Sequence, residues 1–384
     1  MKEIITKLCR GGPLTREEFI LLIQNRNMTL LSSSAHISKN SGRPGDEAQS
    51  GGEGQTVFSY IKEKAFQKRI EVFSNTVFLR GLIECTSFCK NNCLYCGIRG
   101  GNAKAQRYRL SKDDVLSCCA AGYDLGYRTF VLQGGEDPHY TDSFVADVIT
   151  SIKEKYSDCA VTLSLGEKTK QTYELWKSCG ADRYLLRHET ASKEHYEKLH
   201  PHSMSFMNRM NCLHTLKDLG YQTGAGFMVG SPYQTDETLA EDLFFLQSFR
   251  PQMTGIGPFI PHRDTPFAHF SAGNRELTLY LLSVIRLLLP YVLLPATTAL
   301  GTIDSNGREK GLQHGANVIM PNLSPSEVRS KYNLYDNKVS TGKEGAESTR
   351  LLCSCIKDAG FEAVITRGDY TEEKNIKEET LCIM

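Results

Sequence analysis

The sequence of 384 residues has almost no surplus of charge, with a formal net charge of +1, and no long apolar run. It carries 45 basic and 44 acidic residues, so no strong field favours nucleic acid or an anionic membrane as a partner. No segment reaches the roughly 18 uninterrupted apolar residues of a membrane-spanning helix, and the first residues lack an apolar stretch of secretory length. These absences leave small molecules and proteins as the expected partners.

A secreted disulfide framework is not indicated either. The 13 cysteines are scattered along the chain, and Cys118 and Cys119 are adjacent, a spacing that disfavours pairing between them. The thiols therefore favour a reducing compartment, and we expect a cytoplasmic protein. Six cysteines fall within predicted strands or helices and are interpreted as small core residues: Cys85, Cys118, Cys119, Cys159, Cys179 and Cys212.

The sequence also lacks a Gly-x-Gly-x-x-Gly motif and a P-loop motif, which weakens an open doubly wound sheet, the main rival architecture. From residue 76 onward, strand-like apolar runs alternate with helical periodicity, the pattern of a parallel sheet. Eight strands are predicted, the number of a (β/α)8 TIM barrel. They cover residues 77–84, 129–132, 160–165, 183–187, 223–228, 253–258, 291–296 and 316–320. Helices are predicted near residues 113–125, 143–155, 170–178, 205–219, 235–248, 276–289 and 305–314.

The barrel is predicted to span residues 76–335, between two extensions. Residues 1–75 form an N-terminal helical extension, with helices near residues 14–24 and 60–71. Within it, residues 32–55 are rich in Ser, Gly, Asn and Gln, so burial cannot offset their ordering entropy, and we expect a mobile insertion. Residues 336–384 form a C-terminal extension, charged near its end and with little core pattern beyond residues 361–365.

Directly after the first predicted strand, Cys89, Cys93 and Cys96 follow one another with C-x3-C-x2-C spacing. Three thiols on one short loop are suited to ligate three corners of a 4Fe-4S cluster. Such clusters usually take four thiolates, so one iron is left open for another ligand. A structural zinc site is the alternative, but it commonly uses two paired C-x2-C knuckles, and no second knuckle follows.

This spacing, with the aromatic Tyr95 before the last cysteine, resembles the signature of the radical S-adenosylmethionine (SAM) enzymes. The resemblance implies that the amino and carboxylate groups of the cofactor SAM chelate the open iron. It also implies that electron transfer from the reduced cluster cleaves SAM to methionine and a 5′-deoxyadenosyl radical.

In a TIM barrel the active site lies at the carboxyl ends of the strands, and the predicted strand ends here are unusually polar. Gly135 offers a backbone without Cβ beside the Glu136 carboxylate, which is suited to accept from the cofactor ammonium, although an ordinary β-turn is the alternative. Glu189 is suited to accept from ribose hydroxyls or the cofactor amine. Arg209 is suited to clamp a carboxylate, with a surface ion pair as the equal alternative.

Longer stretches resemble the HydE family of radical SAM maturases, which act in assembly of the active-site cluster of FeFe-hydrogenase. They are residues 107–109, 131–138, 161–167, 180–190, 223–226, 255–262, 295–299 and 315–322, within a similarity that spans 77–335. The resemblance implies a full barrel with a 4Fe-4S cluster at its top and a closed cavity below. It also implies that the cofactor is lined by Tyr95, Gly135, Glu136, Ser164, Glu189 and Arg209, and the substrate cavity by Arg187, Thr297, Thr298, Tyr332 and Tyr335.

In HydE the implied substrate is a cysteine-bound iron carbonyl cyanide complex made by the partner maturase HydG. The adenosyl radical attacks the cysteine sulfur, and the product is later loaded through HydF. A low-potential electron donor is implied as well. Cationic Arg187 and the hydroxyls around it would suit an anionic, cyanide-bearing ligand.

One departure concerns a second cluster that some HydE proteins carry on three cysteines. The matching positions here are Ser340, Ser348 and Leu351, and Cys353 and Cys355 are poor substitutes, so we predict one cluster. Two alternative functions stay open. One is a related radical SAM activity of the biotin synthase or methylornithine synthase kind, and the other is a non-catalytic iron–sulfur scaffold.

Overall fold

The computed structural model describes residues 1–30, 55–339 and 345–372. The predicted mobile insertion, apart from Gln55, lies outside the described residues, and so do Ser340 and the side chain of Ser348. In the described part of the chain, no helix is both long and apolar enough to cross a membrane.

Six parallel strands form the main sheet, in the spatial order in which they follow along the chain. They are β2 (Gly81–Thr86), β3 (Thr129–Gly134), β4 (Ala160–Ser164), β5 (Arg183–Leu185), β6 (Gln222–Ala225) and β8 (Met253–Thr254). Two short strands, β7 (Met228–Val229) and β9 (Gly257–Pro258), continue β6 and β8 and pair with each other.

Parallel bridges close this sheet into a barrel. Met253 of β8 pairs with Leu293, and Pro295 pairs with Val318 of β10 (Val318–Ile319). Asn322, just past β10, pairs with Leu82 of β2. The ring therefore contains eight parallel segments, and the predicted TIM barrel is confirmed. The predicted strand at 291–296 is reduced to isolated bridges, since Pro295 has no N–H to donate to a ladder.

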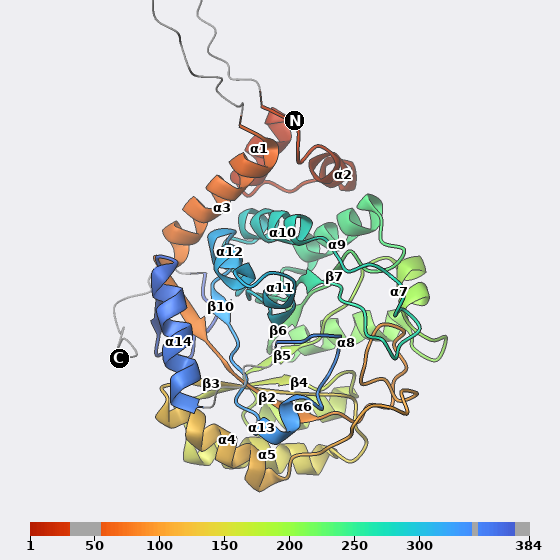
Figure 1. The fold of residues 1–384 in the computed structure, drawn as a ribbon, viewed down its shortest axis with the longest axis vertical. Helices are drawn as coiled ribbons and strands as arrows, with labels where there is room; N and C mark the ends of the chain where they lie inside the picture. The colour runs from red at the N-terminus through yellow and green to blue at the C-terminus, as the bar shows by residue number, and fades with distance from the viewer. Residues whose placement is uncertain (31–54, 340–344, 373–384) are drawn as a thin grey trace, which may run out of the picture.

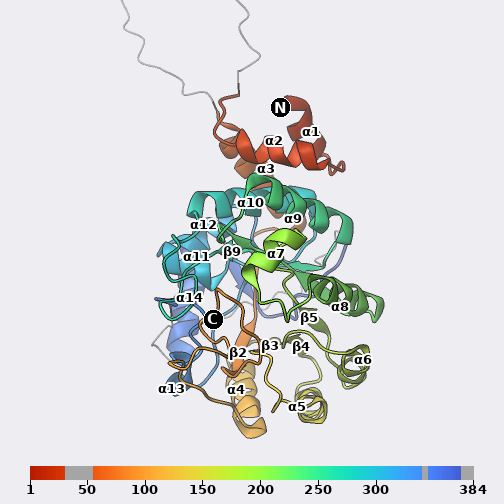
Figure 2. The same cartoon turned by 90° about the vertical axis from the view of Figure 1, so that its right-hand side faces the viewer.

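Helices surround the barrel (Figures 1 and 2). The predicted ones are α4 (Lys112–Asp124), α5 (Asp142–Lys155), α6 (Lys170–Ser178), α8 (Phe206–Asp218), α9 (Asp236–Phe249), α10 (Arg275–Leu288) and α12 (Gly307–Gln313). Six of the seven begin after a Ser, Thr or Asn whose side chain accepts a backbone N–H of the first turn. Three helices between residues 76 and 335 were not predicted because they are too short to show a period: α7 (Lys193–Leu199), α11 (Thr298–Ile303) and α13 (Ser326–Arg329). In the two extensions, α1 (Lys2–Cys9) and α14 (Gly345–Asp358) were not predicted either.

The N-terminal helices are α1 (Lys2–Cys9), α2 (Arg16–Gln24) and α3 (Val57–Phe73), and they gather at one end of the molecule (Figure 1). The α2 helix packs on α9, while α1 and α3 pack on α10. The Gln247 side chain exchanges two hydrogen bonds with the backbone of Leu14, at 2.7 and 2.9 Å. The extension is therefore anchored to the outer helices of the barrel.

The amino ends of the strands are covered by the C-terminal region. Strand β1 (Thr76–Leu79) pairs with β10 and with β11 (Glu362–Val364), which follows α14 (Gly345–Asp358). The buried Arg183 guanidinium donates to Thr129 Oγ1 at 3.0 Å, to the Arg367 carbonyl at 2.7 Å and to Asp369 Oδ1 at 2.6 Å. The opposite, carboxyl ends of the strands are left to form the site.

Candidate active site

A cavity of about 310 Å³ lies at the carboxyl ends of the barrel strands. Of the residues proposed for the site from the sequence, all but Thr298 line it. They are Cys89, Cys93, Tyr95, Cys96, Gly135, Glu136, Ser164, Arg187, Glu189, Arg209, Thr297, Tyr332 and Tyr335. Thr298 lines a second, neighbouring cavity instead. The next residue after Thr297 faces another way because the α11 helix begins at this point.

The loop that carries the three cysteines runs from the end of β2 to α4, and Arg107 holds it together. Its guanidinium donates to the carbonyls of Ser87 and Ile98, the latter at 2.8 Å. It also donates to the carbonyls of Arg99 at 2.7 Å and Asn102 at 3.2 Å. Sequence reasoning gave Arg107 no role, because its partners are backbone atoms that no residue pattern reveals.

The three thiols of this loop are free and reach the same cavity. Burial raises the pKa of all three, and the neighbouring Cys89 thiol helps to raise the pKa of Cys96 to about 12. No three His, Cys, Asp or Glu side chains of the described residues converge on a single metal ion. A cluster binds each thiolate to a different iron, so its ligands need not converge, and the donor set fits a 4Fe-4S cluster.

Gly135 and Glu136, which follow the end of β3, contact this loop closely. A Cβ added to Gly135 would lie 2.2 Å from the Phe88 carbonyl oxygen and 2.7 Å from the Cys89 Cβ. The Glu136 amide donates to Cys89 Sγ at 3.4 Å, and its Oε1 accepts from the Glu167 amide at 2.9 Å. Glycine at position 135 therefore permits the loop to approach the strand end.

Arg187 and Glu189 present charges that lack hydrogen bonds inside the protein. Arg187 Nη2 lies 3.6 Å from Glu189 Oε2, beyond hydrogen-bond length. Arg187 Nε, Arg187 Nη2 and Glu189 Oε2 are all buried without a hydrogen-bond partner. Buried charges in this state are costly unless a ligand pairs with them, so these atoms are suited to hold one.

Arg209, on α8, is already engaged. Its Nε donates to Glu167 Oε1 at 2.6 Å, and its Nη1 donates to the Arg187 carbonyl at 2.8 Å. Although burial opposes the charge, Glu167 and other neighbours hold the pKa of Arg209 well above its ordinary value. The ion pair is thus made, but in a buried position rather than on the surface, and the sequence did not indicate its partner.

Hydrogen bonds orient the hydroxyl groups of Tyr95 and Tyr332 in the site. The Tyr95 hydroxyl lies 3.1 Å from His200 Nε2, whose ring packs edge-on against it. The Tyr332 hydroxyl accepts from Gln133 Nε2 at 3.3 Å. His200 was missed because α7, which precedes it, was not predicted.

Residues 83–246 match the Radical SAM superfamily. The fold is similar to a crystal structure of methylornithine synthase, with a TM-score of 0.75 at 23% identity over 93% of this chain and 96% of the other. It is also similar to the FeFe-hydrogenase maturase HydG from Carboxydothermus hydrogenoformans, with a TM-score of 0.72 at 18% identity, over 95% and 79% of the chains. At these identities the likeness concerns the fold. The barrel, the superfamily match and the cysteine loop together define a radical SAM enzyme.

The sequence is 49% identical to the [FeFe] hydrogenase maturase subunit HydE of Thermotoga maritima, over 71% of this chain and 77% of that protein. It is 31% identical to 3-methylornithine synthase of Methanosarcina acetivorans, over 70% and 75%. The chain belongs to the HydE family, as its motifs predicted.

Proposed function

We propose that this protein is a maturase for the active-site cluster of FeFe-hydrogenase that acts by radical SAM chemistry. Cys89, Cys93 and Cys96 would hold one 4Fe-4S cluster. When bound and reduced, the cluster would supply the electron that cleaves SAM to a 5′-deoxyadenosyl radical. The observation that carries the proposal is that the three thiols share one cavity with Arg187 and Glu189, whose buried Nε, Nη2 and Oε2 atoms have no hydrogen bonds.

The cofactor would lie against the strand ends nearest the cluster loop. Glu189 Oε2, buried and without a hydrogen-bond partner, is placed to accept from the cofactor's amine or ribose. Gly135 keeps the backbone close to the loop, and Glu136 adds a carboxylate there. Arg209 would attract the cofactor carboxylate, while its bonds to Glu167 and to the Arg187 carbonyl fix its orientation. Tyr95 and Ser164 complete this side of the cavity.

The substrate would occupy the rest of the cavity. We propose a cysteine-bound iron carbonyl cyanide complex, attacked at the cysteine sulfur by the adenosyl radical. Such a ligand is anionic, and Arg187 offers a cation whose buried Nε and Nη2 make no hydrogen bonds inside the protein. Thr297, Tyr332 and Tyr335 add hydroxyls, and Met228, Pro258 and Phe259 add apolar walls that exclude water.

The proposed partners follow from this substrate. HydG would supply the complex, HydF would receive the product, and a low-potential donor would reduce the cluster. The cytoplasm is the proposed location, because reduced thiols and a reduced cluster need a reducing compartment.

The test is anaerobic reconstitution with iron and sulfide, followed by electron paramagnetic resonance of the reduced protein with and without SAM. About four irons per chain and a spectrum that SAM changes are expected, since one iron of the cluster is open. About eight irons would contradict the single cluster. A spectrum indifferent to SAM, or no 5′-deoxyadenosine, would favour the scaffold alternative.

A matched pair of variants tests the ligand assignment. Cys93→Ser is expected to lose the cluster and SAM cleavage together. Cys85→Ser, in the preceding strand, should keep both, because the Cys85 thiol is buried and donates to the Ile83 carbonyl at 3.4 Å. Full SAM cleavage by Cys93→Ser would contradict the assignment.

The similarity to 3-methylornithine synthase supports a second candidate, a lysine rearrangement. Incubation of the reconstituted protein with lysine and SAM distinguishes the two functions. Formation of 3-methylornithine would contradict the maturase proposal and support the lysine rearrangement.

A further inference from the structure

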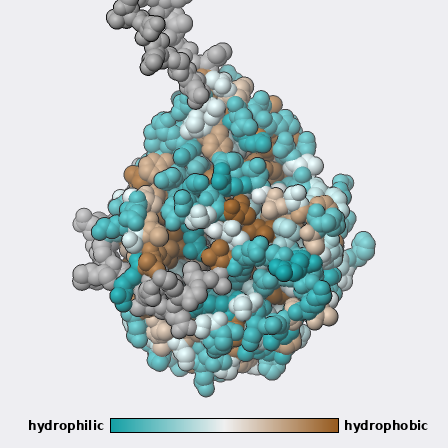
Figure 3. Space-filling model, in the orientation of Figure 1, coloured by the Kyte–Doolittle hydropathy of each residue, from teal (hydrophilic) through white to brown (hydrophobic). Residues whose placement is uncertain are grey.

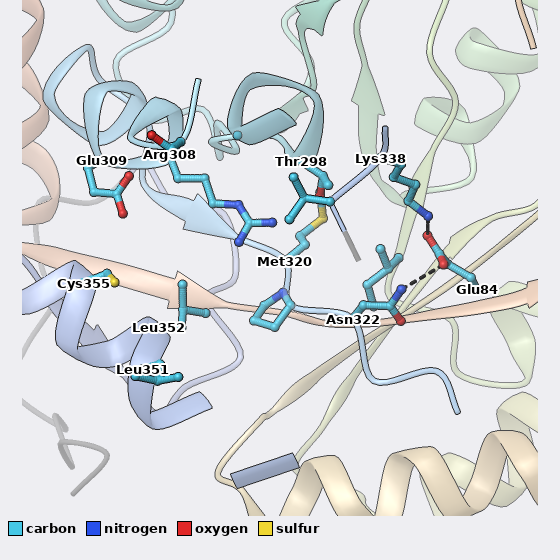
Figure 4. A pocket seen from close by; sticks show the side chains of 15 residues that line it. Glu84, Thr298, Arg308, Glu309, Met320, Asn322, Lys338, Leu351, Leu352 and Cys355 are labelled. Carbon is cyan, nitrogen blue, oxygen red and sulfur yellow. Dashed lines mark hydrogen bonds and ion pairs between the residues drawn. The ribbon is translucent and has the colours of Figure 1, made fainter. Parts of the chain in front are cut away.

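A second cavity, of about 420 Å³, lies beside the first and contains none of the cluster or proposed cofactor residues (Figure 4). The barrel strand β2, the segment after β10 and the helices α11, α12 and α14 form its walls. Figure 3 views the molecule from the same side as Figure 1, and hydrophobic residues reach the surface near the centre of that face. This volume falls in the range of small-molecule sites, roughly 300–1,000 Å³.

One wall of the second cavity is charged but internally satisfied. Lys338 Nζ donates to Glu84 Oε1, and to the Tyr332 carbonyl at 2.9 Å. Asn322 Nδ2 donates to the other Glu84 oxygen at 2.8 Å (Figure 4). Because Tyr332 lines the first cavity, this network forms a partition between the two cavities. Glu84 and Lys338 neutralise each other and leave no charge to offer a ligand.

On α12, by contrast, Arg308 and Glu309 carry charges that the described residues of the protein do not neutralise by a hydrogen bond or an ion pair. Within the described part of the chain, the Arg308 guanidinium has no hydrogen-bond or ion-pair partner, and Figure 4 shows it directed into the cavity above Met320. Glu309 Oε2 is buried without a hydrogen bond, and the two side chains form no ion pair with each other. Burial lowers the pKa of Arg308, so its charge is poorly solvated there. Leaving charges unpaired in such a place is costly.

We propose that the second cavity binds a small zwitterionic α-amino acid with an apolar side chain. Arg308 pairs with its carboxylate, a match that guanidinium geometry favours, and Glu309 accepts from its ammonium group. Met320, Leu351 and Leu352 provide an apolar wall for the side chain. A simple anion would leave Glu309 unpaired and a simple amine would leave Arg308 unpaired, whereas a zwitterion satisfies both. This site goes beyond the proposed function and does not depend on it.

Calorimetric titration of the reconstituted protein with L-leucine, in the presence of saturating SAM, tests the proposal. One leucine per chain is expected to bind. The analogues 4-methylpentanoate, which lacks the ammonium group, and isopentylamine, which lacks the carboxylate, should each bind at least about tenfold more weakly, because each loses one charge-assisted pair. Equal binding of either analogue, or no leucine binding at millimolar concentration, would overturn the proposal.

Two variants test whether leucine binds in the second cavity. Arg308→Met and Glu309→Gln should each weaken leucine binding by about tenfold or more while SAM cleavage is unchanged. Arg250→Met removes a cation that is 66% exposed and distant in sequence, and it should bind leucine like the unsubstituted protein. If leucine binding instead survives both variants, or disappears only when SAM is added, the ligand occupies the first cavity and the proposal fails.

Discussion

His188 and Asp242 are both fully buried and face each other across 3.3 Å, from Nε2 to Oδ1, behind the strand end that carries Arg187 and Glu189. His188 Nδ1 accepts from the Gly226 amide at 3.2 Å, so its proton lies on Nε2. Asp242 Oδ1 accepts from the Ala191 amide at 2.5 Å. Glu189, the residue after His188, has φ of 66°, and its amide donates to the Gly226 carbonyl at 3.0 Å. The pair therefore supports an unusual backbone conformation at a proposed cofactor ligand.

The first prediction concerns the charge of this pair. Burial raises the pKa of Asp242 well above its ordinary value, so a neutral side chain of the same shape should replace it well. Asp242→Asn keeps an oxygen for the Ala191 amide and should change the free energy of unfolding by less than about 1 kcal/mol. Asp242→Leu leaves that amide unpaired and should cost about 1–3 kcal/mol. Denaturant unfolding measures both, and equal losses in the two variants would refute the prediction.

The second prediction concerns pH. Burial lowers the pKa of His188 from 6.5 to about 3, so the unfolded chain binds a proton at this site before the folded chain does. The stability that neutral His188 gives is complete above pH 6.5 and declines as the pH falls toward 3. At about pH 5 this single group should account for a loss of about 2 kcal/mol.

Unfolding of the cluster-free chain at pH 7.5 and about pH 5 measures that loss. His188→Gln should lose less stability between the two values than the unsubstituted chain, and the exposed His202→Gln should lose as much. Identical pH dependence of His188→Gln and the unsubstituted chain would show that His188 does not titrate in this way.

Much of this architecture could be predicted because it depends on local patterns. Strand and helix periods gave the barrel, and cysteine spacing gave the cluster loop. The rule that barrel sites lie at strand ends pointed to several of the thirteen proposed residues that line one cavity, whereas Tyr332 and Tyr335 came only from the family resemblance. The short helices α7 and α11 escaped prediction, and with them the position of His200 and the separation of Thr297 from Thr298.

The interactions that orient the site could not be predicted, because they join segments far apart in sequence or use backbone atoms. Arg107 binds carbonyls, and no pattern marks a carbonyl as a partner. Glu167 pairs with Arg209 only because the loop after β4 lies beside α8 in space. The number of clusters stays a prediction. Cys355 lines the second cavity while Cys353 packs on the core, so these two thiols face different surroundings.

The third prediction tests the close approach at Gly135. Gly135→Ala would place a methyl group 2.2 Å from the Phe88 carbonyl oxygen, so the cluster loop must move. We expect iron binding after reconstitution to fall severalfold and SAM cleavage to fall with it. Gly255→Ala is the matched control, because an added Cβ there meets nothing within 4 Å. Full iron content in Gly135→Ala would show that the loop tolerates the displacement.

The last prediction compares Arg183, in the strand β5, with Arg187, in the turn after this strand. Arg183, at the start of β5, donates to partners that include Asp369, whereas the buried Nε and Nη2 of Arg187 make no hydrogen bonds. Arg183→Met should therefore cost about 1–3 kcal/mol of stability through the acceptors it leaves unpaired. Arg187→Met should cost little stability, because its Nε and Nη2 have no hydrogen bonds to lose.

The effect of Arg187→Met should appear in substrate handling instead. If Arg187 binds the anionic substrate, this variant should still cleave SAM in the absence of substrate. Its KM for the iron complex should rise by about tenfold or more, the effect of losing one charge-assisted contact. Single-turnover assays of 5′-deoxyadenosine and of product separate the two steps. Loss of SAM cleavage in the absence of substrate would instead assign Arg187 to the cofactor, beside Glu189, from which its Nη2 lies 3.6 Å away.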